Sequence, residues 1–262
     1  YSSDLDLIGI ARTGELDPET GRQLLERMRS LLADPAPEGA GYRIDFRLRP
    51  FGRAGRLTTD LASLEEYYLK TASLWELQAL LKLRLLNPGE TEALEFAGRI
   101  EPLLRIPRDP AEIIASVRKN RESAIRQNRE ILQGLREIKN GPGGIRDIEF
   151  LLQALQLIHA PDSPELINGS SLKALDLLGN AEIISVMDQR SLNEGYRLLR
   201  RTEHFLQLYE DRQVHTLPRE PEKLEILGRR CAGVSGSEFL ARIESIATQV
   251  QRISTEYFDR YL

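Results

Sequence analysis

The 262 residues include 36 Lys and Arg against 40 Asp and Glu, a formal net charge of -4, and 41% are hydrophobic. This composition is that of a globular protein with a substantial core, and it gives no reason to expect nucleic-acid binding or a membrane-spanning chain. A single cysteine excludes an intramolecular disulfide and a cysteine-rich zinc site, so we expect a cytoplasmic protein.

The first predicted element is a strand at residues 4–10, which begins with two aspartates in an otherwise apolar run. In YSSDLDLIGI, Asp4 and Asp6 project to the same side of the strand, while Leu5 and Leu7 can pack on the other. Two neighbouring carboxylates repel each other, and a divalent metal with oxygen ligands is the commonest way to keep both ionised. The pattern therefore makes both acids candidate metal ligands.

A helix at residues 18–32 and a loop rich in Pro, Gly and Ala lead to a second predicted strand at residues 42–49. Its sequence, YRIDFRLR, alternates strictly between apolar and polar residues, which is typical of a strand with one buried face. The polar face carries one acid and three basic side chains, namely Arg43, Asp45, Arg47 and Arg49.

Asp45 is a candidate third carboxylate beside the two acids of the first strand. Three such acids could hold two Mg²⁺ ions, or Mn²⁺, which align an attacking oxygen, neutralise a phosphoryl group and stabilise the leaving oxygen. Alternatively, Asp4 caps a turn and Asp45 pairs with Arg43 or Arg47. Arg47 and Arg49 share the face of Asp45, where guanidinium groups suit phosphate oxygens, or else they belong to a solvated strand face.

From residue 60 onward the sequence predicts helices almost throughout. The expected helices cover residues 60–86, 90–104, about 109–135, 145–159, two short segments within 171–186, then 188–209, 220–232 and 237–262. We expect Trp75 and Cys231 in the core. A solvated helix face is expected to carry Arg118, Lys119, Arg121, Arg126 and Arg129. The overall prediction is an α+β protein, with a small mixed β-sheet followed by a mainly helical bundle.

The stretch KNGPGGIRDIEF precedes the predicted helix at residues 145–159. Glycines at a helix start can leave backbone N–H groups free to face an anion, and nearby basic side chains add charge. The candidate phosphate-binding residues are Lys139, Gly143, Gly144 and Arg146. Asp147 and Glu149 either favour the positive end of the helix or form a second acidic catalytic element.

Four stretches in this order, SSDLDL, YRIDFRLRPFG, SLWELQAL and IKNGPGGIRDIEF, resemble the glutamine synthetase adenylyltransferase family of the nucleotidyltransferase superfamily. The resemblance covers essentially the whole chain. It implies a nucleotidyltransferase catalytic domain at residues 1–86, which lacks the family's upstream Gly-Gly pair, and a helical bundle domain at residues 87–262. It further implies that the catalytic metal ligands are Asp4, Asp6 and Asp45, and that Ser2 and Ser3 approach nucleotide phosphates.

The resemblance also implies a reaction on a tyrosine of glutamine synthetase. GGIRDIEF, RLRPFG and LRRTEHFLQLYEDRQVHTLP are more similar to the family's AMP-removing module, in which phosphate attacks the AMP-tyrosine ester and ADP is released. The attaching module instead transfers AMP from ATP. The nitrogen-signalling PII protein is an implied partner, whereas no nucleic acid or membrane is. A third possibility is a catalytically silent regulatory or docking module.

Overall fold

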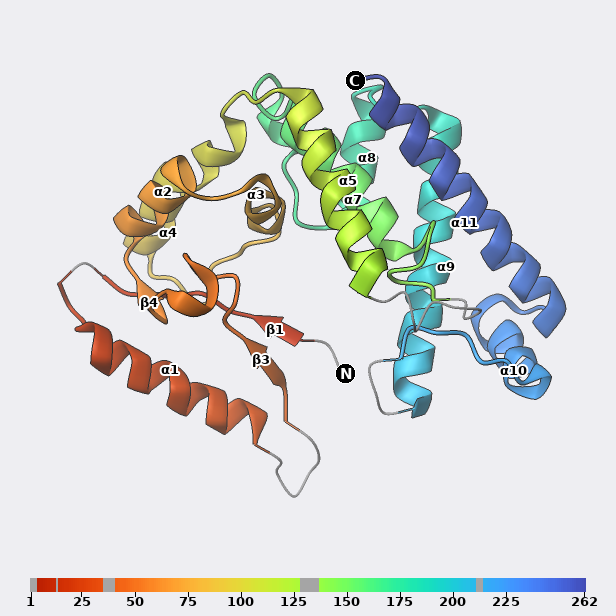
Figure 1. The fold of residues 1–262 in the computed structure, drawn as a ribbon, viewed down its shortest axis with the longest axis horizontal. Coiled ribbons are helices and arrows are strands. Elements are labelled where there is room, and N and C mark those ends of the chain that lie inside the picture. Colours follow the sequence, from red (N-terminus) through yellow and green to blue (C-terminus); the bar gives the residue numbers. More distant parts are fainter. Residues whose placement is uncertain (1–3, 13, 35–40, 128–136, 211–213) are drawn as a thin grey trace. The chain divides into compact units, whose positions relative to one another are not determined.

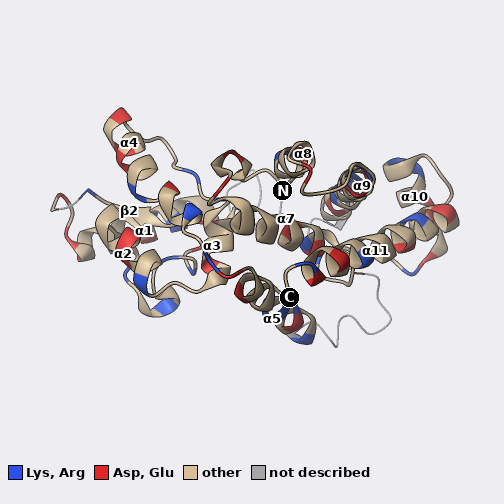
Figure 2. Cartoon of the chain, turned by 90° about the horizontal axis from the view of Figure 1, so that it is seen from above, with Lys and Arg blue, Asp and Glu red and all other residues tan. Residues whose placement is uncertain are grey.

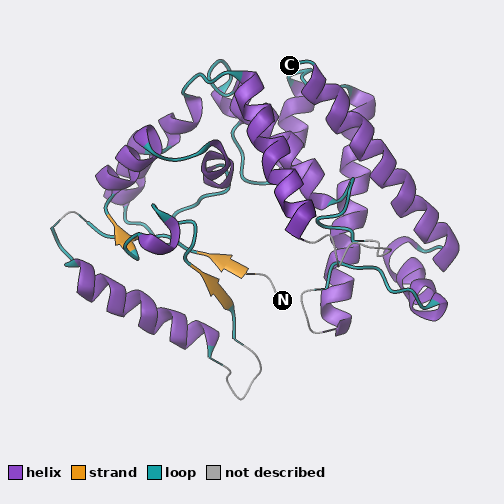
Figure 3. Ribbon diagram, in the orientation of Figure 1, coloured by secondary structure: helices purple, strands orange, loops and turns teal. Residues whose placement is uncertain are grey.

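The computed structural model describes residues 4–12, 14–34, 41–127, 137–210 and 214–262. Within these ranges helices predominate and the strands are short (Figures 1 and 3). Contacts divide the chain into two compact units, Tyr1–Ile106 and Pro107–Leu262. No helix of the described ranges combines the length and apolar character needed to cross a membrane. Small sheets thus come first and a helical bundle follows, as the sequence predicts.

Within the described residues of the first unit, four short strands form two separate two-stranded sheets, each parallel, so the prediction of a single mixed sheet is wrong. β1 (Asp4–Asp6) pairs with β3 (Arg43–Asp45), and β2 (Gly9–Ile10) pairs with β4 (Thr58–Thr59). The prediction of one continuous strand at residues 4–10 is therefore wrong, because Leu7 and Ile8 separate two strands. Leu5 is 36% exposed, so it does not pack as predicted.

β3 is shorter than the predicted strand because the chain turns directly after Asp45. The Asp45 carboxylate accepts a hydrogen bond from the backbone N–H of Arg47 at 2.8 Å, which is typical of an aspartate that starts a turn. Phe51 and Gly52 then adopt left-handed conformations, with φ of 60° and 56°. The alternation prediction is therefore wrong for the residues beyond Asp45.

Side chains cap the start of several helices of the first unit. Its helical elements are α1 (Pro18–Ala33), the 3₁₀ turn η1 (Gly52–Ala54), α2 (Leu61–Lys70), α3 (Leu74–Leu80), α4 (Glu90–Arg99) and the 3₁₀ turn η2 (Glu101–Arg105). The Asp17 carboxylate accepts hydrogen bonds from the backbone at the start of α1, and that of Asp60 does so at the start of α2. These caps satisfy N–H groups that have no partner inside the helix.

The predicted helix at residues 60–86 is interrupted between α2 and α3. Ser73 and Glu76 form a capping box, in which each side chain pairs with the other residue's backbone, and this starts a new helix. Trp75 in the first turn of α3 is 42% exposed, so the prediction that it lies in the core is wrong.

α4 and η2 both pack against α2 and so belong to the first unit. The division of contacts between Ile106 and Pro107 therefore lies beyond the boundary that the sequence places between residues 86 and 87. The assignment of a catalytic and a helical domain on either side of that boundary stays a prediction.

The second unit is a helical bundle with α7 at its centre. Its elements are α5 (Pro110–Gln127), α7 (Ile145–His159), the 3₁₀ turn η3 (Pro164–Leu166), α8 (Ser171–Asn180), α9 (Val186–Glu210), α10 (Pro221–Ala232) and α11 (Gly236–Asp259). α7 packs against α5, α8, α9 and α11, and Leu151 and Leu155 on it are fully buried. α11 carries interspersed acidic and basic residues (Figure 2), which pair at i,i+4 spacing, as Arg242 does with Glu238.

The helix predictions in this unit hold for most elements. α7 has the predicted bounds, and Cys231 is buried in α10 as expected. One helix, α8, stands where two short ones were predicted within residues 171–186. Residues 128–135 of the helix predicted from about 109 lie outside the described ranges.

We expect Leu155→Ala to lower the free energy of unfolding of the second unit by about 2 to 5 kcal/mol, because it leaves a cavity in a side-chain position with no exposure. The matched control is Leu208→Ala on α9, where the leucine is 68% exposed and the change should stay within about 0.5 kcal/mol. Chemical denaturation followed by circular dichroism measures both. Equal effects of the two substitutions would contradict the central position of α7.

Candidate active site

The three predicted acids lie together on one face of the sheet formed by β1 and β3. In the parallel register, Asp6 is paired with Asp45, and Asp4 is paired with Arg43. Paired residues on neighbouring strands point to the same face, and residues two apart on one strand do so as well. The backbone N–H of Leu7 donates to the carbonyl of Asp45 at 2.8 Å and extends this ladder. The sheet therefore gathers Asp4, Asp6 and Asp45, as the sequence predicts.

The carboxylates of this face repel one another and attract arginines. Burial raises the pKa of Asp6, and the negative charges of Asp45 and Asp4 raise it further. The hydrogen bond from Arg47 instead lowers the pKa of Asp45, since Arg47 Nε donates to its Oδ2 at 2.6 Å. Arg43 Nε lies 2.9 Å from Asp4 Oδ1. The pairing of Asp45 with Arg47, which the sequence leaves open, is thus present, and Asp4 pairs with Arg43.

The donor chemistry of this face fits a hard divalent cation. Carboxylate oxygens are the ligands that Mg²⁺ and Mn²⁺ prefer, and the like charges that raise the pKa of Asp6 are what a bound cation would offset. The described residues contain no group of three acidic, histidine or cysteine side chains already arranged around a metal position. Two of the acids are held by Arg43 and Arg47, so a cation would replace these arginines as their partner.

Arg49 does not lie on a strand with Asp45, in contrast to the sequence prediction. Its guanidinium donates three hydrogen bonds to backbone carbonyls, from Nη1 to Phe46 at 2.8 Å, from Nε to Gly55 at 2.9 Å and from Nη2 to Arg53 at 3.1 Å. Because β3 ends at Asp45, the alternation no longer governs this side chain. Arg49 fixes the turn after β3, and its role as a nucleotide ligand stays a prediction.

The glycine-rich segment of the second unit is fastened by its own hydrogen bonds. The Gly143 N–H donates to Asp147 Oδ2 at 2.6 Å, and the Gly144 N–H donates to the Gly141 carbonyl at 3.0 Å. The N–H groups of Ile145 and Arg146 are likewise donated to backbone carbonyls. The expectation that free N–H groups here face an anion is therefore wrong for this arrangement.

Close packing against α11 requires a glycine at position 143. Its φ is +73°, and a Cβ at this position would overlap the backbone of Ala247 on α11. Glycine thus allows the loop before α7 to approach α11 closely. The assignment of Gly143 and Gly144 to phosphate binding stays a prediction that these contacts do not favour.

Lys139 is engaged by a buried acid that the sequence analysis missed. Glu203 on α9 is 3% exposed, and its carboxylate lies 3.2 Å from Lys139 Nζ, 2.7 Å from Arg200 Nη1 and 3.3 Å from His215 Nδ1. Burial alone would raise the pKa of Glu203, but the hydrogen bond from His215 and the charges of Lys139 and Arg200 lower it to about 2. Arg146 lies over the ring of Phe150 instead, 5.6 Å from its centroid.

A second missed pair joins α5 to the start of α7. Arg121 forms an ion pair with Asp147, and its guanidinium also donates to the carbonyls of Asn140 and Gly141 at 2.6 and 2.8 Å. The prediction of a solvated face is therefore wrong for Arg121. The sequence signal for this position was that Arg121 follows Val117 by four residues, so both lie on the same face of the helix, and Val117 is buried.

Glu149 accepts a hydrogen bond from the Tyr196 hydroxyl at 3.0 Å, and Asp147 is paired with Arg121, so both acids of α7 have structural partners. Ser2 and Ser3, the predicted contacts of the nucleotide phosphates, lie outside the described residues.

Comparisons with known proteins identify the family. A family model described as glutamate-ammonia ligase adenylyltransferase matches residues 1–98, and one described as GlnD PII-uridylyltransferase matches residues 112–258. The chain is similar to the bifunctional glutamine synthetase adenylyltransferase/adenylyl-removing enzymes of Streptomyces coelicolor, with 32% identity over all of this chain, and of Stenotrophomonas maltophilia, with 34% identity over 98% of it.

The chain belongs to the glutamine synthetase adenylyltransferase family. It spans 27 and 28% of the length of these two relatives, so it corresponds to about a quarter of such an enzyme.

The charged cluster around Glu203 predicts a pH-dependent stability. The pKa of Glu203 is about 2 in the folded chain, against 4.5 for an ordinary glutamate, so its charge stabilises the fold above about pH 4.5 and this contribution is lost as the pH falls toward 2. We expect Glu203→Gln to lower the melting temperature at pH 7, with the difference from wild type shrinking between these pH values.

The control for this experiment is Glu194→Gln, an exposed glutamate on the same helix, which should leave the melting temperature unchanged. Thermal unfolding at several pH values measures both variants. A deficit of Glu203→Gln that stays constant from pH 7 to pH 2 would contradict the charged state of the buried carboxylate.

Proposed function

We propose that this chain is a metal-dependent nucleotidyl-transfer module that acts on glutamine synthetase and removes AMP from its adenylylated tyrosine. The observation that carries the proposal is the parallel register that pairs Asp6 with Asp45 and leaves Asp4 on the same face. Three acids on adjacent strands suit phosphoryl chemistry better than a purely structural role, since burial and then the charges of Asp45 and Asp4 raise the pKa of Asp6. The first unit would then be a small nucleotidyltransferase-type domain.

In the proposed reaction, an oxygen of inorganic phosphate forms a bond to the phosphorus of the AMP-tyrosine ester while the bond from phosphorus to the tyrosine oxygen breaks. The products are ADP and the free tyrosine, whose oxygen takes up a proton. One or two divalent cations held by Asp4, Asp6 and Asp45 would supply positive charge to the transferred phosphoryl group. Arg47 keeps Asp45 ionised until a cation is bound, because its hydrogen bond lowers the pKa of that acid.

The removing direction is supported by the similarity of residues 47–52, 143–150 and 199–218 to the removing module, and by the match of residues 112–258 to the uridylyltransferase family model. The names of the relatives include both AMP attachment and AMP removal, so transfer of AMP from ATP to the tyrosine is the alternative. Glutamine synthetase is the proposed protein substrate, and PII is a proposed partner of the helical unit. A catalytically silent docking module is the remaining alternative.

We expect Asp6→Asn, introduced into the complete enzyme that contains this chain, to reduce ADP formation from adenylylated glutamine synthetase, Mg²⁺ and phosphate by at least about a hundredfold. Removal of one charge weakens cation binding while the shape of the side chain is kept. The matched control is Asp34→Asn, an exposed aspartate of the same unit after α1, which should retain full activity.

Circular dichroism shows whether each variant is folded, so that loss of activity can be assigned to the acid. ADP formation by Asp6→Asn at the wild-type rate would contradict AMP removal by this face. Loss of pyrophosphate release from ATP and unmodified glutamine synthetase in Asp6→Asn would assign the attaching direction to this chain. Wild-type rates of both reactions in Asp6→Asn would favour the silent module.

A further inference from the structure

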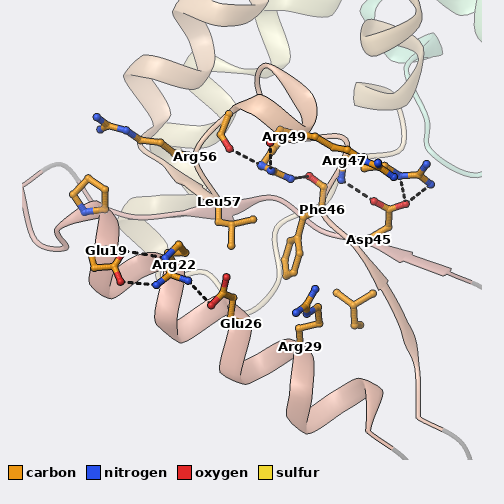
Figure 4. A pocket seen from close by; sticks show the side chains of 14 residues that line it. Glu19, Arg22, Glu26, Arg29, Asp45, Phe46, Arg47, Arg49, Arg56 and Leu57 are labelled. Atoms are coloured by element: carbon orange, nitrogen blue, oxygen red, sulfur yellow. Dashed lines mark hydrogen bonds and ion pairs between the residues drawn. The ribbon is translucent and has the colours of Figure 1, made fainter.

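A cavity of about 900 Å³ lies in the first unit between α1 and the segment from Ile44 to Leu57 (Figure 4). Arginines dominate its lining. Six of them come from both sides, namely Arg22, Arg29, Arg47, Arg49, Arg53 and Arg56, and they face three acids, Glu19, Glu26 and Asp45. Ligand pockets in proteins commonly have volumes of about 300 to 1,000 Å³, so the cavity has room for a small molecule.

All three acids of the lining form ion pairs with two of these arginines. Arg22 pairs with Glu19 and Glu26 at 2.5 Å each, and Arg47 pairs with Asp45 at 2.5 Å. Each acid therefore already has a cationic partner and offers little to the remaining arginines.

The other arginines carry charge that the lining does not neutralise. Arg49 donates only to backbone carbonyls, which bear no net charge. In the part of the chain that the structure describes, no hydrogen bond or ion pair engages the side chains of Arg29, Arg53 and Arg56, and all three are exposed. Six positive charges against three negative ones leave the cavity with an excess of three.

The floor of the cavity is apolar and lies on the opposite side of β3 from the carboxylates. Figure 4 shows Phe46 and Leu57 pointing toward α1, whereas Asp45 and Arg47 lie at the far edge. Ile44 precedes Asp45 on the strand and so points to the other face. The cavity is thus centred on the helix-covered side of the sheet, away from the candidate metal face.

Uncompensated arginines around a concave site are a distinctive charge arrangement. Like charges in a cleft raise the local positive potential and attract anions from solution. Guanidinium groups present forked donors that match phosphate oxygens two at a time. A ligand with two or three phosphate groups would meet the excess charge, and its non-phosphate part could lie on the apolar floor.

We propose that this cavity binds the polyphosphate chain of a small molecule through Arg29, Arg53 and Arg56, at a site that includes Asp45 at its edge but neither Asp4 nor Asp6. The shared chemistry is two or more linked phosphates, supplied by an inorganic polyphosphate or by a nucleotide. The site reaches the candidate active site at one point, because the charge of Arg53 helps to lower the pKa of Asp45. The proposal does not depend on the direction or the existence of the transfer reaction.

Calorimetric titration of the full chain with tripolyphosphate, in EDTA and at low salt, tests the proposal. We expect saturable binding that weakens as salt is added, because exposed charge interactions are screened. Arg29→Ala, Arg53→Ala and Arg56→Ala should each weaken binding about tenfold, the effect of losing one charge-assisted contact. Titrations with ATP and with adenosine distinguish the two sources of the linked phosphates. If ATP binds more tightly than tripolyphosphate, the apolar floor binds the nucleoside of a nucleotide. If the two bind equally, the ligand is an inorganic polyphosphate.

The matched control is Arg27→Ala, an exposed arginine of α1 that does not line the cavity and should leave binding unchanged. Asp6→Asn should also bind tripolyphosphate as wild type does, whatever its effect on activity. Three results would overturn the proposal: no saturable binding, an equal loss in Arg27→Ala, or binding that requires Mg²⁺ and disappears in Asp6→Asn. The last result would place the anion at the carboxylates instead.

Discussion

The parallel pairing of β1 with β3 is the constraint that brings Asp4, Asp6 and Asp45 to one face of the first unit. A slip of one residue would carry Asp45 to the helix-covered face and separate it from Asp6, because side chains alternate along a strand. Asp45 helps to prevent this slip through its own backbone and side chain. Its carbonyl accepts from Leu7 in the ladder, and its carboxylate accepts from Arg47 in the turn that ends the strand. One residue thus sets the register and supplies the third acid.

Several arginines around β3 divide into three kinds by what accepts their hydrogen bonds. Arg43 and Arg47 pair with acids of the sheet. Arg49 donates to backbone carbonyls and shapes the turn that follows β3. Among the described residues, Arg29, Arg53 and Arg56 of the cavity have neither kind of partner, which is why a ligand explains them better than folding does. The same residue type thus serves charge balance, loop shape and an open site.

The sequence predicts the parts of this arrangement that depend on periodicity. Alternation on the two strands places the three acids on one face, and apolar spacing gives α7 its observed bounds. Periodicity does not reveal where a strand stops. The hydrogen bond from the Arg47 N–H to the Asp45 side chain, and those from Arg49 to backbone carbonyls, were therefore not predicted. It also does not reveal long-range partners. Glu203 lies more than sixty positions from Lys139, and nothing in the pattern of either segment points to the other.

The glycine-rich segment of the second unit illustrates why a motif does not fix a role. Its glycines, its lysine and its position before a helix are all features of a phosphate loop, but the same features serve packing here. Moving Lys139 toward a nucleotide would take one of two cations from Glu203, a carboxylate that is 3% exposed and costly to leave short of partners. Arg121 likewise ties Asp147 and the carbonyl of Gly141 to α5. The charged side chains of this segment already form ion pairs within the second unit. The first unit is therefore where we look for the phosphate chemistry proposed above.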